Sequence, residues 1–183
     1  MGSGRFLLRL PPTLHDNLAA RAEAQGLSLN EYCVRKLAGP ETAGLAEPAA
    51  LAIRARAEAV SGTRLVGIIV HGSWARGDAG TASDVDVLVV VEPALPLTRA
   101  LYRAWDGKAL SWAGRHVDAH FVHLPADPER AGGVWCEAAV DGIVLHDPEG
   151  RVEPVLRRIR RAIADRRLVR KRVHGQPYWT EAA

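Results

Sequence analysis

Two aspartates, Asp84 and Asp86, have the type and spacing that most clearly suggest chemistry. They stand at the start of an apolar run that ends at Val91 and reads as a buried strand. Because residues i and i+2 of a strand point to the same face, the two carboxylates should project side by side. Adjacent carboxylates repel each other, and a hard divalent cation removes this cost. The pair is therefore a candidate metal site.

The chain reaches this pair through a turn that suits phosphate. Residues 65–70 form another apolar, β-branched run, and His71 leads from it into Gly72 and Ser73. Glycine lets a backbone approach a ligand closely, and N–H groups exposed where a strand feeds a short helix favour phosphate. The sequence thus predicts a phosphate turn and a carboxylate pair on neighbouring strands. His71, beside the turn, is either a nucleotide contact or a structural histidine.

The combined motif is Gly72-Ser73, then ten residues, then Asp84-x-Asp86. It resembles the signature of the polymerase-β-like nucleotidyltransferase superfamily, and most closely its minimal nucleotidyltransferase branch. The residues that fit are Gly72, Ser73, Ala75, Arg76, Gly77, Ser83, Asp84 and Asp86. A pair of strands with incidental acids is the competing interpretation.

This resemblance implies transfer of a nucleotidyl group from ATP or another NTP to a hydroxyl. Two Mg²⁺ ions about 4 Å apart would be bound by Asp84 and Asp86. Gly72 and Ser73 would hold the β- and γ-phosphates, and Arg76 would neutralise part of their charge. Positioning and charge stabilisation would carry most of the catalysis.

Members of the superfamily also carry a third carboxylate, on a later strand beside the Asp-x-Asp strand. Asp118, in the strand-like run 115–124, is the residue that the resemblance assigns to this role. It would complete the metal site and could take the acceptor proton; otherwise it is an edge-strand acid facing water. His116, His120 and His123 share the run, but their spacing suits a metal site on a helix, so we do not predict zinc there.

Residues 1–40 are predicted to form a separate module. Residues 5–10 alternate in the manner of a strand and end at two prolines, and two short helices should follow. The residues that share one face of this strand are Arg5, Leu7 and Arg9. Ser28 and Glu31 form a capping-box pattern for the second helix. One strand and two short helices cannot bury a sufficient core alone. The module therefore requires a partner.

The same segment resembles the ribbon-helix-helix family of DNA-binding proteins, through its L-R-L-P and G-x-S-x-N-E motifs. In that family two chains pair their strands into a ribbon that enters the DNA major groove. The resemblance implies a homodimer through residues 1–40, bound to operator DNA. The residues implied to contact DNA are Arg5, Leu7 and Arg9 on the ribbon and Ser28 and Asn30 at the second helix. A dimerisation module without DNA binding is the alternative.

Size and composition are those of a globular protein, with 183 residues, 48% hydrophobic and 25% charged. No stretch approaches the length of a membrane span, so we expect a cytoplasmic protein without a membrane partner. Cys33 and Cys136 lack metal-ligand spacing and should pack as small apolar residues. The predicted class is α+β: a ribbon-helix-helix module followed by an α/β nucleotidyltransferase domain with a mixed sheet flanked by helices. The predicted divisions are residues 1–40, a linker at 41–48 and a domain at 49–183.

Positive charge gathers near the end of the chain. Residues 151–172 contain ten Lys or Arg against two acids, although the whole chain has a net charge of only +3. Apolar residues recur there every three or four positions, which predicts a basic amphipathic helix. Its charge indicates either an anionic partner or a solvated helix face. Tyr178 and Trp179 in the following tail should dock on the domain or on a partner.

Together the two resemblances imply an antitoxin-like, DNA-binding nucleotidyltransferase that transfers AMP to a tyrosine of a partner toxin. Two alternatives stay open. The acceptor could be tRNA or a small molecule such as an aminoglycoside, and the basic segment favours tRNA. The protein could also be a DNA-binding regulator whose transferase fold only senses nucleotide, but the intact Asp84, Asp86 and Asp118 argue against this.

Overall fold

The chain falls into two units in the computed structural model, residues 1–39 and residues 40–183. The structure describes residues 7, 9–23, 26–37, 48–173 and 176–182. In the first unit, α1 (Pro12–Glu23) packs against α2 (Leu29–Leu37). Pro12 opens α1 as predicted, because the first turn of a helix does not need its N–H.

Two capping motifs connect the helices of the first unit. Leu27 N–H donates to the Ala22 carbonyl at 3.0 Å across Gly26, whose φ is 65°. Ser28 N–H donates to Glu31 Oε2 at 2.9 Å, and Glu31 N–H donates to Ser28 Oγ at 3.2 Å. This reciprocal pair is the predicted capping box, and it fixes the start of α2.

The predicted strand at 5–10 lies largely outside the described residues, as does the linker at 41–47. Leu7, Arg9 and Leu10 are described and lie in no helix or strand, and Leu7 is 83% exposed. A ribbon forms only between two chains, so this strand stays a prediction. Pro48, predicted to close the linker, is already the first residue of a helix.

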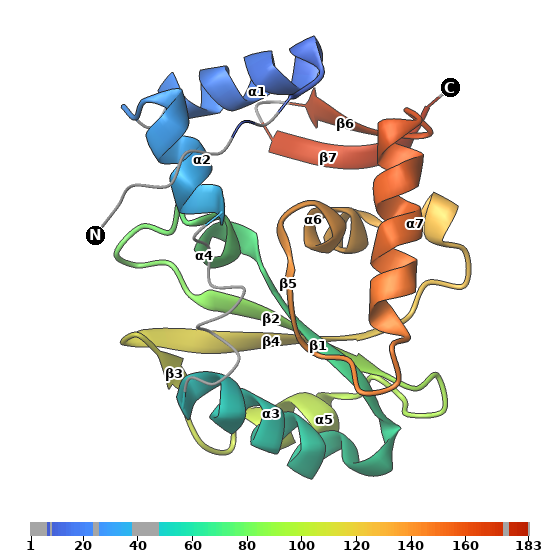
Figure 1. The fold of residues 1–183 in the computed structure, drawn as a ribbon. Helices are drawn as coiled ribbons and strands as arrows, with labels where there is room; N and C mark the ends of the chain where they lie inside the picture. The colour runs from blue at the N-terminus through green and yellow to red at the C-terminus, as the bar shows by residue number, and fades with distance from the viewer. Residues whose placement is uncertain (1–6, 8, 24–25, 38–47, 174–175, 183) are drawn as a thin grey trace. The chain divides into compact units, whose positions relative to one another are not determined.

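The second unit is built around a five-stranded sheet (Figure 1). Its elements in chain order are α3 (Pro48–Ser61), η2 (Gly62–Arg64), β1 (Leu65–His71), α4 (Gly72–Arg76), β2 (Val85–Val91), α5 (Arg99–Asp106), β3 (Ser111–Trp112), β4 (Arg115–His123), η3 (Pro128–Arg130), α6 (Gly133–Asp141), β5 (Ile143–His146), α7 (Val152–Ala164), β6 (Leu168–Val173) and β7 (Gln176–Glu181). The strand order is β3-β4-β2-β1-β5, with β2 and β4 parallel and the other neighbours antiparallel. The sheet is therefore mixed, as predicted.

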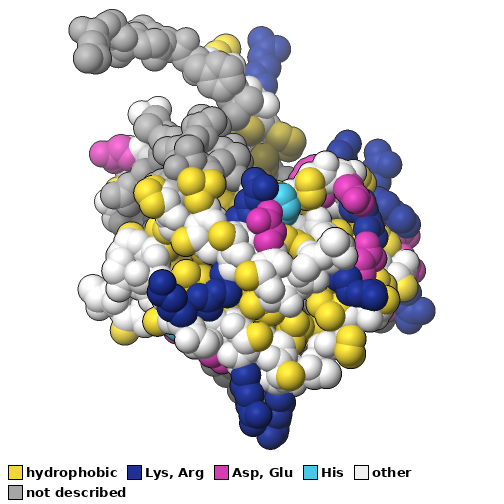
Figure 2. All heavy atoms as spheres, turned by 90° about the horizontal axis from the view of Figure 1, so that it is seen from below, with side chains coloured by type: hydrophobic (Ala, Val, Ile, Leu, Met, Phe, Trp, Pro, Cys, Tyr) yellow, Lys and Arg dark blue, Asp and Glu magenta, His cyan; other side chains and the backbone are white. Residues whose placement is uncertain are grey.

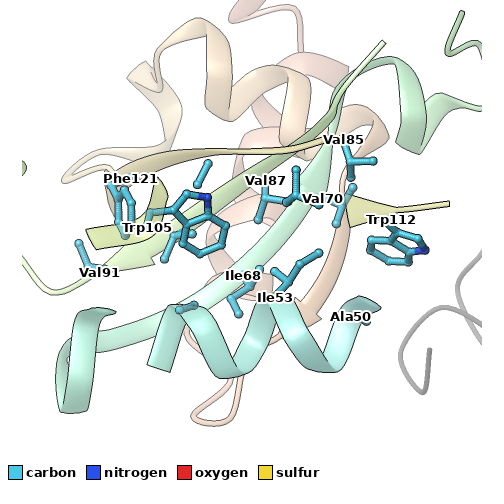
Figure 3. Packing of buried hydrophobic residues seen from close by; sticks show 14 of the residues in the cluster. Ala50, Ile53, Ile68, Val70, Val85, Val87, Val91, Trp105, Trp112 and Phe121 are labelled. Carbon is cyan, nitrogen blue, oxygen red and sulfur yellow. The ribbon is translucent and has the colours of Figure 1, made fainter. Parts of the chain in front are cut away.

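Helices cover both faces of this sheet, α3 and α5 on one side and α6 and α7 on the other (Figure 1). Val85 and Val87 of β2 point toward α3 and α5, where Trp105 meets Phe121 edge to face (Figure 3). Leu88, one position out of phase, packs with α6 and α7. A strand buried on both faces is apolar throughout, which explains the unbroken run of β2. By the same alternation, Asp86 faces the side of α6 and α7.

The C-terminal region corrects one prediction. The basic helix expected across residues 151–172 ends at Ala164, and a β-hairpin of β6 and β7 follows. Arg166 adopts a positive φ of 59°, which ends the helical path. Leu168 is buried beside α6 and α7, and this burial outweighs the helix propensity of the neighbouring arginines.

The tail folds back on the domain. Trp179 Nε1 donates to Glu137 Oε1 of α6 at 2.7 Å, and Arg170 forms an ion pair with the same carboxylate oxygen at 3.0 Å. Tyr178, on the opposite face of the hairpin, remains 43% exposed. Of the two docking sites left open for the aromatic pair, Trp179 thus uses the domain itself.

Charged and hydrophobic side chains are dispersed over the face below the sheet. Figure 2 shows that Lys and Arg side chains lie there in separate small groups, with hydrophobic side chains between them. Leu51 and Leu97 are 52% and 42% exposed. Within the described ranges, no helix combines the length and the apolar character needed to cross a membrane.

Candidate active site

Three strands bring titratable side chains into one row across the sheet. His71 of β1 lies opposite Asp86 of β2, and Asp86 lies opposite Asp118 of β4. Neighbouring strands are about 5 Å apart, so side chains in such a row are close neighbours. Asp86 consequently has an imidazole on one side and a carboxylate on the other. The carboxylate predicted on a later strand is thus adjacent to the Asp-x-Asp strand.

Electrostatic coupling brings Asp84 and Arg76 into the same group. Burial is the main reason that the pKa of Asp86 lies above its ordinary value, and His71 opposes this rise. The negative charges of Asp118 and Asp84 raise the pKa of Asp86 further, and Arg76 lowers it. Asp84 and Asp118 are exposed, whereas Asp86 is half-buried. The predicted acids therefore lie within electrostatic reach of one another.

Gly72 joins the turn to the carboxylates. Its φ is 76°, and a Cβ at this position would collide with Asp86 Oδ2 and lie 3.2 Å from Asp86 Cγ. Glycine is required here for two reasons, the left-handed backbone and the close approach of the acid. The Gly-Ser turn and the acid pair are therefore in direct contact.

Ser73 and Arg76 lie in the short helix α4 that follows Gly72. The Ser73 carbonyl accepts the Asp78 N–H at 3.0 Å, which closes the end of this helix. Arg76 Nε donates to Asp78 Oδ2 at 3.1 Å in an ion pair. The charge of Arg76 also influences Asp86, so its guanidinium lies at the edge of the candidate site.

Two further groups near the site are Glu137 and His120. Burial is the main cause that lowers the pKa of His71, and His120 lowers it further. The negative charges of Asp86 and Glu137 oppose this shift. Glu137 comes from α6 and was not singled out by the sequence, because nothing local marks a helix residue that packs over a distant strand. Cys136 beside it is buried, and burial raises its pKa to about 11, so it offers no thiolate.

The donor chemistry of the three aspartates fits magnesium, which prefers carboxylate oxygens. A cation would also relieve the repulsion that raises the pKa of Asp86. In the part of the chain that the structure describes, no three acidic, histidine or cysteine side chains converge closely enough to enclose an ion. Asp84 and Asp118 are exposed, which leaves their carboxylates room to turn toward one.

The predicted DNA contacts belong to the first unit. Arg5 lies outside the described residues, and Leu7 and Arg9 lie in no strand. Ser28 and Asn30 stand at the start of α2 as expected. The N–H of Ser28 is already bonded within the capping box, so a phosphate there would have to use amides further along the first turn.

Comparisons with known proteins identify two segments of the chain. Residues 2–37 match the HicB family, and residues 53–134 match the nucleotidyltransferase domain. Nine chains of solved structures match; one is described as "Crystal structure of the toxin-antitoxin with AMP-PNP". That match has 19% identity and a TM-score of 0.40, and it covers 65% of this chain and 86% of the other. No curated protein matches the chain in sequence.

Residues 53–134 of the second unit are thus similar to a nucleotidyltransferase domain. The matched residues include the Gly-Ser turn and the row formed by Asp86 and Asp118.

Proposed function

We propose that this protein is a Mg²⁺-dependent nucleotidyltransferase, transferring AMP from ATP, or another nucleotidyl group from its NTP, to a hydroxyl of a macromolecular acceptor. The premise is the nucleotidyltransferase domain of residues 53–134. The observation that carries the proposal is the register of Asp86 opposite Asp118, with the Asp86 carboxylate against Gly72.

The residues of the turn would bind the triphosphate. Gly72 has no side chain, so a phosphate can approach its backbone closely. The half-buried Ser73 follows at once and offers a hydroxyl and an N–H. Arg76, already paired with Asp78, would add positive charge at the edge of the phosphates.

The carboxylates would serve the reacting atoms. Asp84, Asp86 and Asp118 would hold two Mg²⁺ ions, whose charge would activate the acceptor oxygen and stabilise the triphosphate. The acceptor oxygen forms a bond to the α-phosphorus, and the bond between this phosphorus and the departing pyrophosphate breaks. Asp118, exposed on β4, would accept the proton of the acceptor hydroxyl. The protein contributes positioning and electrostatic stabilisation, and no covalent intermediate is needed.

For the acceptor we propose a partner toxin, with a tyrosine as the modified residue. The first unit would dimerise and bind operator DNA through Arg5, Leu7, Arg9, Ser28 and Asn30. The capping box at Ser28 and Glu31 supports the helical part of this proposal. The match to the HicB family covers the same segment of the chain.

An RNA acceptor is the second candidate, favoured by the charges of residues 151–172. Four of the ten basic residues form ion pairs: Arg151, Arg160, Arg167 and Arg170. The other six are exposed and make no ion pair with any described residue: Arg157, Arg158, Arg161, Arg166, Lys171 and Arg172. Exposed, unpaired cations attract a phosphate backbone.

The test uses the full chain with α-³²P-labelled ATP and Mg²⁺, together with either a co-expressed candidate toxin or total cellular RNA. Label should appear on one acceptor, and the variant carrying Asp84→Ala and Asp86→Ala should abolish it. Asp106→Ala, which removes an exposed acid at the end of α5, is the control and should retain activity. Label that persists in the double variant would contradict the metal-site assignment.

A further inference from the structure

Arg115, the first residue of β4, contacts a loop that is distant in sequence. Its Nη1 donates to the carbonyl oxygens of Gly80 and Ser83, the latter at 2.9 Å. Ser83 directly precedes Asp84, and Asp118 follows Arg115 on the same strand. One half-buried guanidinium therefore connects the strand of Asp118 to the loop that presents Asp84.

The loop of residues 77–84 is bonded to α4 at its start, through the Asp78 N–H and carboxylate, and has few bonds after that. Ser83 N–H donates to the Gly80 carbonyl at 3.2 Å, which makes a single turn. Gly77 and Gly80 permit many backbone conformations, and most of the loop is exposed. The direction in which Asp84 points thus depends on what holds this loop.

Arg115 is itself fixed by the short hairpin of β3 and β4. It pairs with Trp112, and the turn between them has positive φ at Ala113 (50°) and Gly114 (77°). Trp112 is only 3% exposed, and its ring centroid lies 4.4 Å from that of Trp74 in α4. The hairpin is anchored in the core, so the guanidinium is presented from a rigid element.

We propose that Arg115 is a positioning residue, which holds Asp84 where it can bind a metal together with Asp86 and Asp118. This inference rests on the metal site of the proposed function. A guanidinium keeps its charge and offers several donors in a fixed fork, so it can hold two carbonyls at once. Lysine at this position would reach one of them. Loss of a group that orients a metal ligand costs about 10- to 100-fold in metal affinity.

The test measures binding of Mn²⁺, which accepts the same oxygen donors as Mg²⁺, by the electron paramagnetic resonance of the free ion. The full chain is compared with Arg115→Ala, Arg115→Lys and a matched control, Arg56→Ala. Arg56 also donates to two carbonyls, those of Trp105 and Lys108, but it belongs to α3, on the other face of the sheet from Asp86. Hydrogen exchange of residues 77–84, measured without metal, gives a second readout.

We expect Arg115→Ala to weaken Mn²⁺ binding by about 10-fold or more and to speed exchange in residues 77–84. Arg115→Lys should recover part of the affinity, and Arg56→Ala should leave both readouts unchanged. Wild-type affinity in Arg115→Ala, or equal losses in Arg115→Ala and Arg56→Ala, would overturn the role of Arg115 alone. If the wild-type chain binds no Mn²⁺, the metal site fails, and the positioning role fails with it.

Discussion

Acidic side chains lie at both ends of β2, and the surroundings shift their pKa values in opposite directions. Glu92, just after the strand, accepts two hydrogen bonds from Arg151, and this pairing lowers its pKa. Asp86, near the start, is half-buried beside Asp84 and Asp118, and its pKa is raised. Glu92, which supports the fold, is neutralised by the guanidinium of Arg151. An acid cluster whose repulsion is left in place has the electrostatics of a site prepared for an external cation.

The largest effect on this contrast is expected from Asp86→Asn. Nucleotidyl transfer should fall by about 10²- to 10³-fold, since a charged group at the reacting centre is removed. The free energy of unfolding without metal should rise at neutral pH, because the substitution removes a charge that burial and neighbouring acids penalise. Label transfer and urea unfolding measure the two effects.

Glu92→Gln provides the opposite pattern for comparison, with lower stability and unchanged transfer. A loss of stability in Asp86→Asn at neutral pH would show that Asp86 is a structural acid like Glu92.

Gly72→Ala should have the next largest effect. The alanine Cβ would meet the Asp86 carboxylate in a left-handed backbone conformation. Gly77 has nearly the same φ, 74° against 76°, but nothing lies within 4 Å of its Cβ position. Backbone strain alone should cost about 1–2 kcal/mol in Gly77→Ala, and Gly72→Ala should cost about 1–3 kcal/mol more.

The collision can be isolated with a double variant. In an Asp86→Ala background, Gly72→Ala should cost no more than Gly77→Ala, as measured by urea unfolding. An undiminished cost there would place the strain elsewhere than at the carboxylate.

The geometry at the start of β2 is predictable from the sequence because its signals are local. A glycine before a serine, and aspartates at i and i+2 at the start of an apolar run, define their own geometry. The family resemblance singles out Asp118 within a strand-like run, and its register opposite Asp86 places it beside this pair. Metal binding by these residues and DNA binding by the first unit remain predictions.

What the sequence misses is long-range. Arg115 meets Ser83 across 32 positions, and Glu137 meets Trp179 across 42, so no local pattern records either contact. The two-residue strand β3 is too short for any periodicity to show. Residues 168–172, which form most of β6, are expected as helix because arginine has good helix propensity, whereas tertiary burial of Leu168 decides the outcome.

A smaller effect is expected at the start of α7, where Arg151 pairs with Glu92. Asp147 accepts backbone N–H bonds from Arg151, Val152 and Glu153, and so caps α7. Asp147→Ala should lower the free energy of unfolding by about 1–2 kcal/mol without changing nucleotidyl transfer. Glu149→Ala, in the same turn and 73% exposed, should change it by less than about 0.5 kcal/mol. Equal effects of the two substitutions in urea unfolding would contradict the capping role.

The smallest effect concerns pH. The folded pKa of Glu92 lies below the unfolded value of 4.5, so its stabilisation is complete above pH 4.5 and is lost as pH falls through the folded pKa. The pKa of Asp86 is raised above 3.8, so the folded state gains relative stability as pH falls through the folded pKa toward 3.8. Glu92→Gln should therefore lessen the loss of stability in acid, and Asp86→Asn should deepen it. Urea unfolding between pH 7 and pH 3 measures how each substitution changes the pH dependence of the free energy of unfolding relative to wild type. Changes of the same sign in the two variants would mean that the two ends of β2 do not differ in electrostatics.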